Sequence, residues 1–301
     1  MSATVLRDAV GLIGLGRMGS AMAERLAQTG IEAIGWDQNP AAVGAFVAGG
    51  GQAAPHARAV AGAAKLVITT ITEDVGVRGL FHGADGMLRG DIAGTLFVEM
   101  STLQPATVRE LAPAIEAHGA RIVDAPVLGT IPSVRDGTLV ALLGGAVEDV
   151  ARARPVLDVI AHKVIHLGPL GSGHAMKLAV NLGLAAFVQG LAESLALGER
   201  EGLSLEAMLA VLSVAPTANA WLSARKGVLT GERSDVTLDI RTLRKDVLSV
   251  LATGARDGVT MPLSAGVLAA LSAAVAGDWG DRDIGELAAF LREKIVQRYD
   301  A

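Results

Sequence analysis

Short apolar runs alternate with segments of helical composition over roughly the first half of the chain. The apolar runs are Val10–Ile13, Ile31–Trp36, Leu66–Ile71, Thr95–Met100, Arg121–Val127, Leu139–Leu143 and Lys163–Leu167. Runs of this length are typical of buried strands. Helical segments such as Pro105–His118 and Val147–Ile160 lie between them. The alternation predicts an α/β fold built on a doubly wound parallel sheet.

The pattern changes to nearly continuous helix after a Gly/Pro-rich stretch at residues 166–173. We therefore predict one domain over residues 1–168 and an all-α domain over residues 169–301. The second domain begins with a long helix, roughly Ala175–Glu201. This helix is apolar nearly all round, which predicts burial between domains and against a partner chain. Its polar residues, such as Gln189 and Glu193, argue against a membrane span.

The first strand runs into a glycine-rich turn, Gly14-x-Gly16-x-x-Gly19, followed by a helix over Ser20–Gln28. Gly14 suits a tight turn, Gly16 lets a pyrophosphate approach the backbone, and Gly19 lets the helix pack on the strand. The phosphates would lie at the helix N-terminus, where free N–H groups favour anions. This strand–turn–helix context predicts that the first domain binds a dinucleotide. The predicted cofactor contacts in this turn are Gly14, Leu15, Gly16, Arg17, Met18 and Gly19.

The second apolar run ends at an acid, Asp37, which lies twenty-three residues after Gly14. A carboxylate there would accept hydrogen bonds from a ribose 2′-OH and repel a 2′-phosphate. Gln38 follows, and no arginine stands in the next few positions to hold a phosphate. The cofactor is therefore predicted to be NAD rather than NADP.

Composition narrows the function classes further. The 301 residues carry a formal net charge of −5 and no cysteine. The acidic balance disfavours nucleic acid and anionic membranes as partners. The lack of cysteine excludes disulfides and thiolate chemistry and fits a cytoplasmic location. The six histidines show no metal-binding spacing, so no metal site is predicted.

Lys177 and Asn181 are the sharpest candidates for catalysis. Four residues apart on a helix, they project from the same face. They follow Gly171 and Gly173, whose small size would let a ligand approach. A desolvated lysine can exchange a proton with a substrate oxygen during hydride transfer, and Asn181 could orient that oxygen. The alternative is a lysine at a helix end that extends to solvent.

Two strand ends supply further candidates, because ligands of open α/β sheets bind at the carboxyl ends of strands. Ser101 and Thr102 follow one strand, where their hydroxyls could meet a nicotinamide amide or cap the next helix. Asp124–Thr130 follows another, and Gly129 there frees backbone amides that could bind a small carboxylate. A strand bending into an ordinary turn is the alternative. Lys245-Asp246 lies in a charged helix and, taken alone, indicates a solvated face.

Together these motifs resemble the β-hydroxyacid dehydrogenase family, which includes 3-hydroxyisobutyrate dehydrogenase and tartronate semialdehyde reductase. The resemblance covers essentially the whole chain. The family motif GxGxMG is similar to Gly14–Gly19, the strand-end Ser-Thr to Ser101-Thr102, and DAPVSGG to Asp124–Thr130. The motif GxGxxxKxxNN is similar to Gly171–Asn181, and the late Lys-Asp pair to Lys245-Asp246.

The resemblance implies a Rossmann-like domain joined to a helical domain, commonly as a homodimer or homotetramer, as in 6-phosphogluconate dehydrogenase-like proteins. It implies that Lys177 is the general acid/base and that Asn181 orients the substrate. Cofactor contacts would come from Ile71, Thr102 and Lys245. Substrate contacts would come from Ser101, Leu128, Gly129 and Thr130.

Three positions depart from the family pattern and bear on the substrate. Leu128 replaces the serine of DAPVSGG, Thr130 replaces its second glycine, and Val180 replaces the first Asn of the NN pair. These changes favour a more apolar substrate than a small, highly polar hydroxyacid. The expected activity is NAD-dependent hydride transfer to or from a small hydroxyacid or semialdehyde. The alternatives are an imine reductase, which Lys177 argues against, and a non-catalytic nucleotide-binding member of the family.

Overall fold

The computed structural model describes residues 9–233 and 235–299, which fold into two compact units. The first unit ends at Leu178 and the second begins at Ala179. The predicted α/β and all-α classes of the two halves are confirmed.

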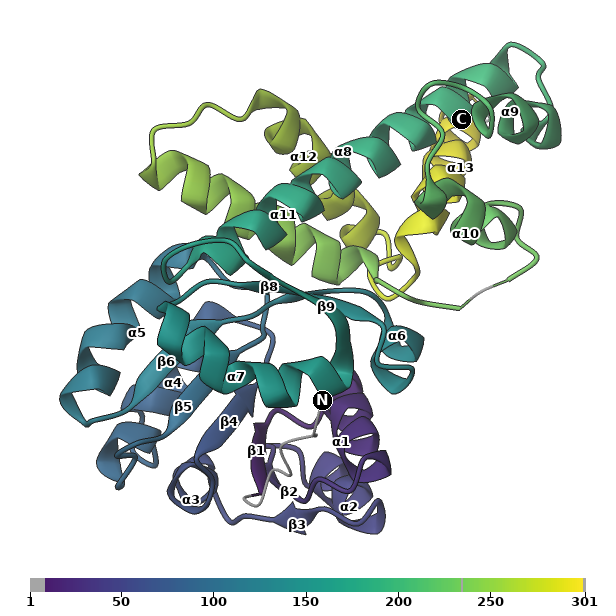
Figure 1. The fold of residues 1–301 in the computed structure, drawn as a ribbon. Coiled ribbons are helices and arrows are strands. Elements are labelled where there is room, and N and C mark those ends of the chain that lie inside the picture. Colours follow the sequence, from purple (N-terminus) through teal and green to yellow (C-terminus); the bar gives the residue numbers. More distant parts are fainter. Residues whose placement is uncertain (1–8, 234, 300–301) are drawn as a thin grey trace. The chain divides into compact units, whose positions relative to one another are not determined.

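A six-stranded parallel sheet forms the centre of the first unit (Figure 1). Its strands lie in the order β3-β2-β1-β4-β5-β6. The winding therefore reverses between β1 and β4, and the crevice at the carboxyl ends of these two strands is where open α/β sheets bind ligands. The strands are β1 (Val10–Ile13), β2 (Ala33–Trp36), β3 (Gln52–Ala53), β4 (Leu66–Thr69), β5 (Leu96–Glu99) and β6 (Arg121–Asp124).

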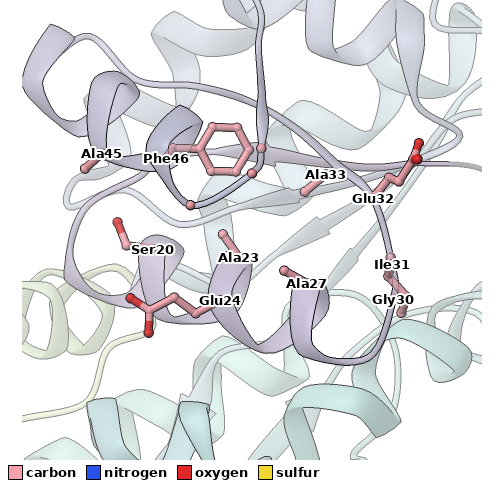
Figure 2. Close-up of a pocket in the computed structure, with 13 residues that line it drawn as sticks. Ser20, Ala23, Glu24, Ala27, Gly30, Ile31, Glu32, Ala33, Ala45 and Phe46 are labelled. Atoms are coloured by element: carbon pink, nitrogen blue, oxygen red, sulfur yellow. The ribbon is translucent and has the colours of Figure 1, made fainter.

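Helices cover both faces of this sheet (Figure 1). The helices of the first unit are α1 (Arg17–Gln28), α2 (Pro40–Ala48), α3 (Ala57–Ala63), α4 (Asp74–His82), α5 (Pro105–Ala117), α6 (Ile131–Arg135), α7 (Val147–Ile160) and the 3-10 turn η1 (Met87–Arg89). A shallow pocket lies between α1 and α2, lined by Phe46 and bordered by Glu24 and Glu32 (Figure 2). Glu32 precedes β2, so this pocket extends toward the amino ends of the strands, away from the predicted site.

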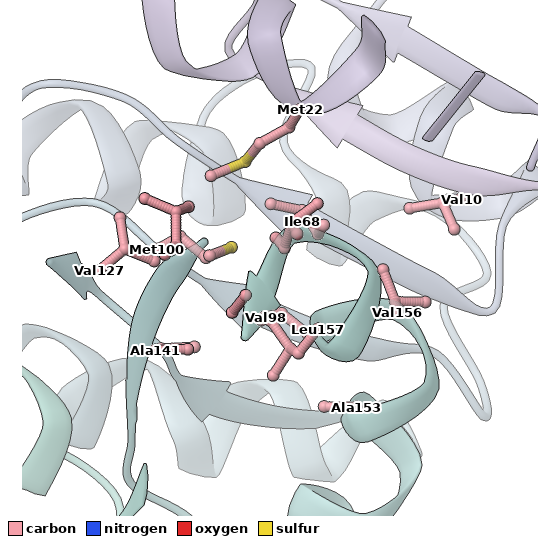
Figure 3. Packing of buried hydrophobic residues seen from close by; sticks show 14 of the residues in the cluster. Val10, Met22, Ile68, Val98, Met100, Val127, Ala141, Ala153, Val156 and Leu157 are labelled. Carbon is pink, nitrogen blue, oxygen red and sulfur yellow. The ribbon is translucent and has the colours of Figure 1, made fainter. Parts of the chain in front are cut away.

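The alternation of side chains along β5 shows how the sheet builds two cores. Leu96 and Val98 face one side, where they pack with residues of α1 and α7 such as Met22 and Leu157 (Figure 3). Phe97 faces the other side and meets Phe81 of α4 edge to face, with ring centroids 5.0 Å apart. Since successive strand residues point to opposite faces, a continuous apolar run fills both cores.

A second, three-stranded sheet follows the first and departs from the single sheet that the apolar runs suggest. It consists of β7 (Val127–Leu128), β8 (Leu139–Leu143) and β9 (Ala161–His166), with β7 antiparallel and β9 parallel to β8. The run predicted as one strand, Arg121–Val127, breaks between β6 and β7. Pro126 lies at the break, and its missing N–H cannot extend the ladder of β6.

The second unit is helical around an apolar core that includes Leu195, Leu243 and Leu271, each fully buried. Its helices are the greater part of α8 (Ser172–Arg200), then α9 (Leu205–Leu212), α10 (Ala220–Leu229), α11 (Ile240–Arg256), α12 (Pro262–Ala276), η2 (Ile284–Glu286) and α13 (Leu287–Tyr299). By length and composition α8 is the one helix of the described residues that could cross a membrane, and core helices of soluble proteins pass the same test. Its most apolar 18-residue window is 39% buried, so the described residues do not cover this helix on every side.

Candidate active site

Three glycines shape the turn between β1 and α1. Gly14 has φ +91°, and a Cβ there would lie 2.1 Å from the carbonyl oxygen of Thr70, after β4. A Cβ on Gly19 would lie 1.9 Å from the carbonyl oxygen of Gly14. Gly16 differs, because no heavy atom lies within 4 Å of the place its Cβ would occupy. An open glycine backbone at the start of a helix, beside the switch point of the sheet, fits the approach of a pyrophosphate.

Asp37, at the end of β2, is held by backbone N–H groups from two turns. The N–H of Leu15 donates to Oδ2 at 2.7 Å, and the N–H of Asn39 donates to Oδ1 at 2.7 Å. A carboxylate oxygen accepts more than one hydrogen bond, so Asp37 keeps acceptor capacity for a ribose hydroxyl. The side chain of Leu15 is buried in the core, so the glycine turn presents its exposed members, Gly16 and Arg17, to solvent.

The turns after β4 and β5 are tied together through Ser101. The Ile71 N–H donates to Ser101 Oγ at 2.9 Å. The Ser101 N–H donates to Glu99 Oε1 at 2.8 Å, and Thr69 Oγ1 donates to Glu99 Oε2. Ser101 is 4% exposed, so its hydroxyl already has a structural role in fixing the turn that presents Thr102. Burial raises the pKa of the Glu99 carboxyl to about 7, although the hydrogen bonds from Ser101 and Thr69 oppose that rise.

Asp124, at the end of β6, caps the start of α8. Its carboxylate accepts the N–H groups of Gly171 at 2.6 Å and of His174 at 2.7 Å. The ring of His174 lies with Nδ1 3.4 Å from Asp124 Oδ2 and Nε2 3.0 Å from the carbonyl oxygen of Ser101. A carbonyl can only accept, so Nε2 carries the proton and donates. The start of α8 is thus bonded to the strand end that carries Ser101.

The small size of Gly171 and Gly173 serves the packing of the chain itself, which corrects the expectation that it admits a ligand. A Cβ on Gly173 would lie 2.1 Å from the carbonyl oxygen of Leu142 in β8. A Cβ on Gly171 would lie 2.6 Å from Arg109 Nε. Close approach of α8 to β8 therefore explains Gly173, whereas Gly171 has φ +91° and lies against the Arg109 side chain of α5.

Lys177 reaches the predicted substrate loop. One turn along α8 from His174, it is half-buried, and its Nζ donates to the carbonyl oxygen of Val127 at 2.9 Å. Val127 and the half-buried Leu128 form β7, within that loop. The lysine is therefore folded back onto the first unit's strand ends, which differs from a lysine extending to solvent.

The rest of the loop is shaped by Gly129 and Thr130. Gly129 has φ +137°, and a Cβ there would lie 2.5 Å from Leu139. The N–H of Thr130 donates to Ser133 Oγ at 3.2 Å, where Thr130 caps α6. Among the backbone amides expected to be available to a carboxylate, that of Thr130 thus has a partner within the chain.

The candidates of the second unit form a buried polar group of their own. Asn181 Nδ2 donates to Asp246 Oδ2 at 2.6 Å, and Lys245 Nζ lies 2.8 Å from Asp246 Oδ1. Asp246 is 2% exposed, so it does not lie on a solvated face. It falls on the same stripe of α11 as the buried Leu243 and Val247, which explains its burial.

Two buried residues were missed from the sequence, namely Glu99 and His174. Glu99 is a single acid at the end of the apolar run Leu96–Met100, and an acid at a parallel strand end is a usable signal. His174 stands between the glycines and Lys177, where nothing in the local pattern indicates that its ring turns back to Ser101. Among the residues with described positions, no three His, Asp or Glu side chains gather as a metal site.

Comparison with known proteins agrees with this geometry. A family model described as the NAD binding domain of 6-phosphogluconate dehydrogenase matches residues 9–168. A second, described as NAD-binding of NADP-dependent 3-hydroxyisobutyrate dehydrogenase, matches residues 171–291.

Individual relatives extend the match over most of the chain. The chain is 32% identical to 2-(hydroxymethyl)glutarate dehydrogenase of Eubacterium barkeri over 85% of each protein. It is 34% identical to the NAD-dependent L-serine dehydrogenase of Pseudomonas aeruginosa over 67% of this chain and 68% of that one. The structure of Mycobacterium tuberculosis 3-hydroxyisobutyrate dehydrogenase with L-serine superposes with a TM-score of 0.85 at 29% identity, over 95% and 99% of the two chains. The protein therefore belongs to the β-hydroxyacid dehydrogenase family.

Proposed function

We propose that this protein is an NAD-dependent dehydrogenase of a small 2- or 3-hydroxyacid, or a reductase of the matching semialdehyde, with Lys177 as its general acid/base. The observation that carries the proposal is the contact of Lys177 Nζ with the Val127 carbonyl, 2.9 Å away. It brings Lys177, the predicted proton carrier, to the loop that follows β6. A bound nicotinamide would accept or supply the hydride at its C4 atom.

The chain's own residues have distinct tasks in this reaction. Lys177 Nζ takes the hydroxyl proton in oxidation and returns it to the carbonyl oxygen in reduction. Asn181, whose amide is oriented by Asp246, is the candidate for holding the substrate oxygen. Gly16 leaves its backbone open to the pyrophosphate. The Ser101 turn presents Thr102 to the cofactor, as the family resemblance implies.

The preference for NAD rests on Asp37. Its carboxylate lies at the end of β2 and keeps acceptor capacity beyond its bonds to Leu15 and Asn39. A 2′-phosphate placed beside this charge would be repelled, whereas a ribose 2′-OH would donate to it. The names of relatives point to both cofactors, so the ratio of kcat/KM for NAD and NADP decides this part of the proposal.

Leu128 bears on the choice of substrate. It directly follows the carbonyl that Lys177 contacts and is half-buried. An apolar side chain here gives a polar substrate group no hydrogen bond, so hydroxyacids with an alkyl substituent are expected to be preferred over more polar ones.

The test is an initial-rate assay that follows reduced cofactor, with NAD or NADP and a panel of polar and alkyl-substituted hydroxyacids and cyclic imines. We expect turnover of a hydroxyacid with NAD. Lys177→Ala should lower kcat by about 10² to 10⁴-fold, the usual contribution of a positioned acid/base, with unchanged affinity for NAD. Lys65→Ala is the matched control, because Lys65 also donates to a backbone carbonyl, that of Ala93, but precedes β4 at the other end of the sheet.

Near-wild-type turnover by Lys177→Ala would remove the lysine from the mechanism. Turnover of imines alone would favour the imine reductase alternative. A higher kcat/KM with NADP than with NAD would overturn the cofactor assignment.

A further inference from the structure

Glu99 is a buried carboxylate at the level where the strands of the first unit end. It is 0% exposed and is the last residue of β5. In the sheet it pairs with Thr69 of β4 on one side and with Asp124 of β6 on the other. Its hydrogen-bond partners are the hydroxyls of Thr69 and Ser101 and the backbone N–H of Ser101, rather than the cation that commonly compensates a buried acid.

The carboxylate organises two turns at once. Oε1 accepts the Ser101 N–H, and Ser101 Oγ in turn accepts the Ile71 N–H. Ile71 and the neighbour of Ser101, Thr102, are the residues expected to approach the cofactor. An ionised carboxylate can accept from Ser101 and from Thr69 simultaneously, whereas a protonated one must use one oxygen as a donor. Both forms can therefore hold the turn, since a protonated carboxyl can donate to the Thr69 hydroxyl, and they differ in the negative charge that only the ionised form places there.

The pKa of the Glu99 carboxyl lies close to neutral pH. Burial raises the pKa of its carboxyl from 4.5 to about 7, the hydrogen bonds from Ser101 and Thr69 lower it, and Asp74 of α4 raises it further. Two further titratable groups lie near this turn: Asp124 of β6, which pairs with Glu99 in the sheet, and His174 of α8, whose ring contacts the carbonyl oxygen of Ser101. A positive charge placed next to the turn would lower this pKa and favour the ionised carboxylate.

We propose that Glu99 is a positioning residue for the cofactor turn and that it binds a proton in competition with the oxidised, positively charged nicotinamide. The oxidised ring carries a positive charge and the reduced ring carries none. A carboxylate beneath the turn that receives the ring attracts only the oxidised form. This inference rests on the proposed function in one respect, namely that the nicotinamide of a dinucleotide lies at the Ile71 and Ser101–Thr102 turns.

Thermodynamic linkage between proton binding and cofactor binding determines the direction of the pH dependence. If the oxidised cofactor favours ionised Glu99, its binding lowers the pKa of that carboxyl and releases a proton wherever Glu99 is protonated in the free protein. Affinity for NAD⁺ should then rise with pH from about 5.5 to 8 and level off above the pKa. Affinity for NADH should change little over the same range.

The experiment compares the wild-type protein with Glu99→Gln by isothermal titration calorimetry with NAD⁺ and with NADH, at several pH values. Each titration is run in two buffers of different ionisation enthalpy, which gives the number of protons released. Glutamine is isosteric, can accept from Ser101 and can donate to Thr69, so the fold of the turn should survive. Glu110→Gln is the control, because Glu110 is an exposed acid of α5 that pairs with Arg78.

For the wild type we expect about tenfold tighter NAD⁺ binding at pH 8 than at pH 5.5, the equivalent of a one-unit change in pKa, and about half a proton released at pH 6.5. The affinity for NADH should change by less than about twofold over the same pH range, since the uncharged reduced ring does not favour the ionised carboxylate. Glu99→Gln should bind NAD⁺ with the weak affinity of the wild type at low pH, and with no pH dependence from this group. The difference between the curves of the two proteins reports the effect of removing the Glu99 carboxyl.

Two results would overturn the inference, namely equal pH dependence for NAD⁺ and NADH in the wild type, or an unchanged NAD⁺ curve in Glu99→Gln. Failure of the proposed function has a different signature. Pronounced NAD⁺ linkage without turnover of any hydroxyacid would remove the dehydrogenase assignment and keep the role of Glu99. Turnover of a hydroxyacid with pH-independent cofactor binding would keep the dehydrogenase assignment and remove the role of Glu99. Failure to bind either dinucleotide would overturn both proposals.

Discussion

At the scale of the residue, burial of the Glu99 carboxyl lowers the stability of the folded protein at neutral pH. The unfolded carboxyl has a pKa near 4.5, whereas burial in the folded protein raises it to about 7. Between these values the folded protein retains a proton that the unfolded chain loses. Stability therefore falls as the pH rises from about 4.5 to 7 and stays at the lower level above that. An uncharged residue of the same shape would avoid the loss, so the acid is better explained by what it does for the turn.

We expect Glu99→Gln to gain stability relative to the wild type as the pH rises. The difference in the free energy of unfolding should grow between pH 4.5 and 8 by at most about 3 kcal/mol, the equivalent of the rise in pKa. Urea denaturation at pH 4.5, 6 and 8 measures it, with Glu110→Gln as an exposed control. A difference that is the same at all three pH values would show that Glu99 is ionised to the same extent in the folded and unfolded states.

At the scale of the element, the start of α8 is fixed by close approach to β8. Gly173 lies against the carbonyl oxygen of Leu142, and the Asp124 carboxylate caps the helix through Gly171 and His174. Lys177 follows one turn later, so the position of its ammonium group depends on how the start of α8 packs against β8.

We expect Gly173→Ala to destabilise the protein by about 1–3 kcal/mol, because the new Cβ would meet the Leu142 oxygen at 2.1 Å and α8 would have to shift. Activity should fall by more than the loss of folded protein accounts for, because Lys177 would move with the helix. Gly44→Ala in α2 is the matched control. Apart from the backbone of α2 itself, no heavy atom lies within 4 Å of a Cβ at Gly44, so the substitution should stabilise by about 0.5–1 kcal/mol. Thermal unfolding and kcat of both variants provide the check, and a Gly173→Ala protein as stable as the control would contradict the packing argument.

The elements that the sequence predicted well are those with a continuous physical signal. The strands β1, β4 and β5 fill two cores and therefore stand out as continuous apolar runs in the sequence. The turn after β1 leaves no room for a side chain at Gly14 or Gly19, so its glycine spacing can be recognised as well. The two-residue strand β7 has no such signal, and its antiparallel partner β8 lies beyond a short helix. The ring of His174 and the burial of Asp246 are set by tertiary packing, which no local pattern encodes.

At the scale of the whole molecule, the second unit leaves apolar side chains uncovered near the end of α8 and on α9. Leu197, Leu203, Val211 and Val214 are 67%, 55%, 66% and 83% exposed. Such a group on one chain is typical of a surface that meets another protein. Together with the incomplete burial of α8, it favours a homodimer or homotetramer.

Light scattering after size exclusion should accordingly give two or four times the chain mass of 30.7 kDa at micromolar concentration. The double variant Leu197→Asp, Val211→Asp should shift the mass toward that of the single chain, because charges would be buried at the interface. Val75→Asp, which alters an equally exposed residue of α4 in the first unit, serves as the control. A wild-type protein that elutes with the mass of one chain would contradict the prediction.

The two backbone bonds of Asp37 constrain how cofactor preference can be altered. One carboxylate oxygen holds the glycine turn through Leu15, and the other holds the start of α2 through Asn39. Replacing the acid by a small neutral residue, to admit a 2′-phosphate, would also release the loop that shapes the pyrophosphate site. Evolution or engineering toward NADP is therefore easier by keeping Asp37 and introducing a cation at the exposed Gln38 than by removing the acid. The residue that we propose discriminates between the cofactors also holds two turns of the backbone together, so a single substitution that removes it should disturb the fold of the site as well.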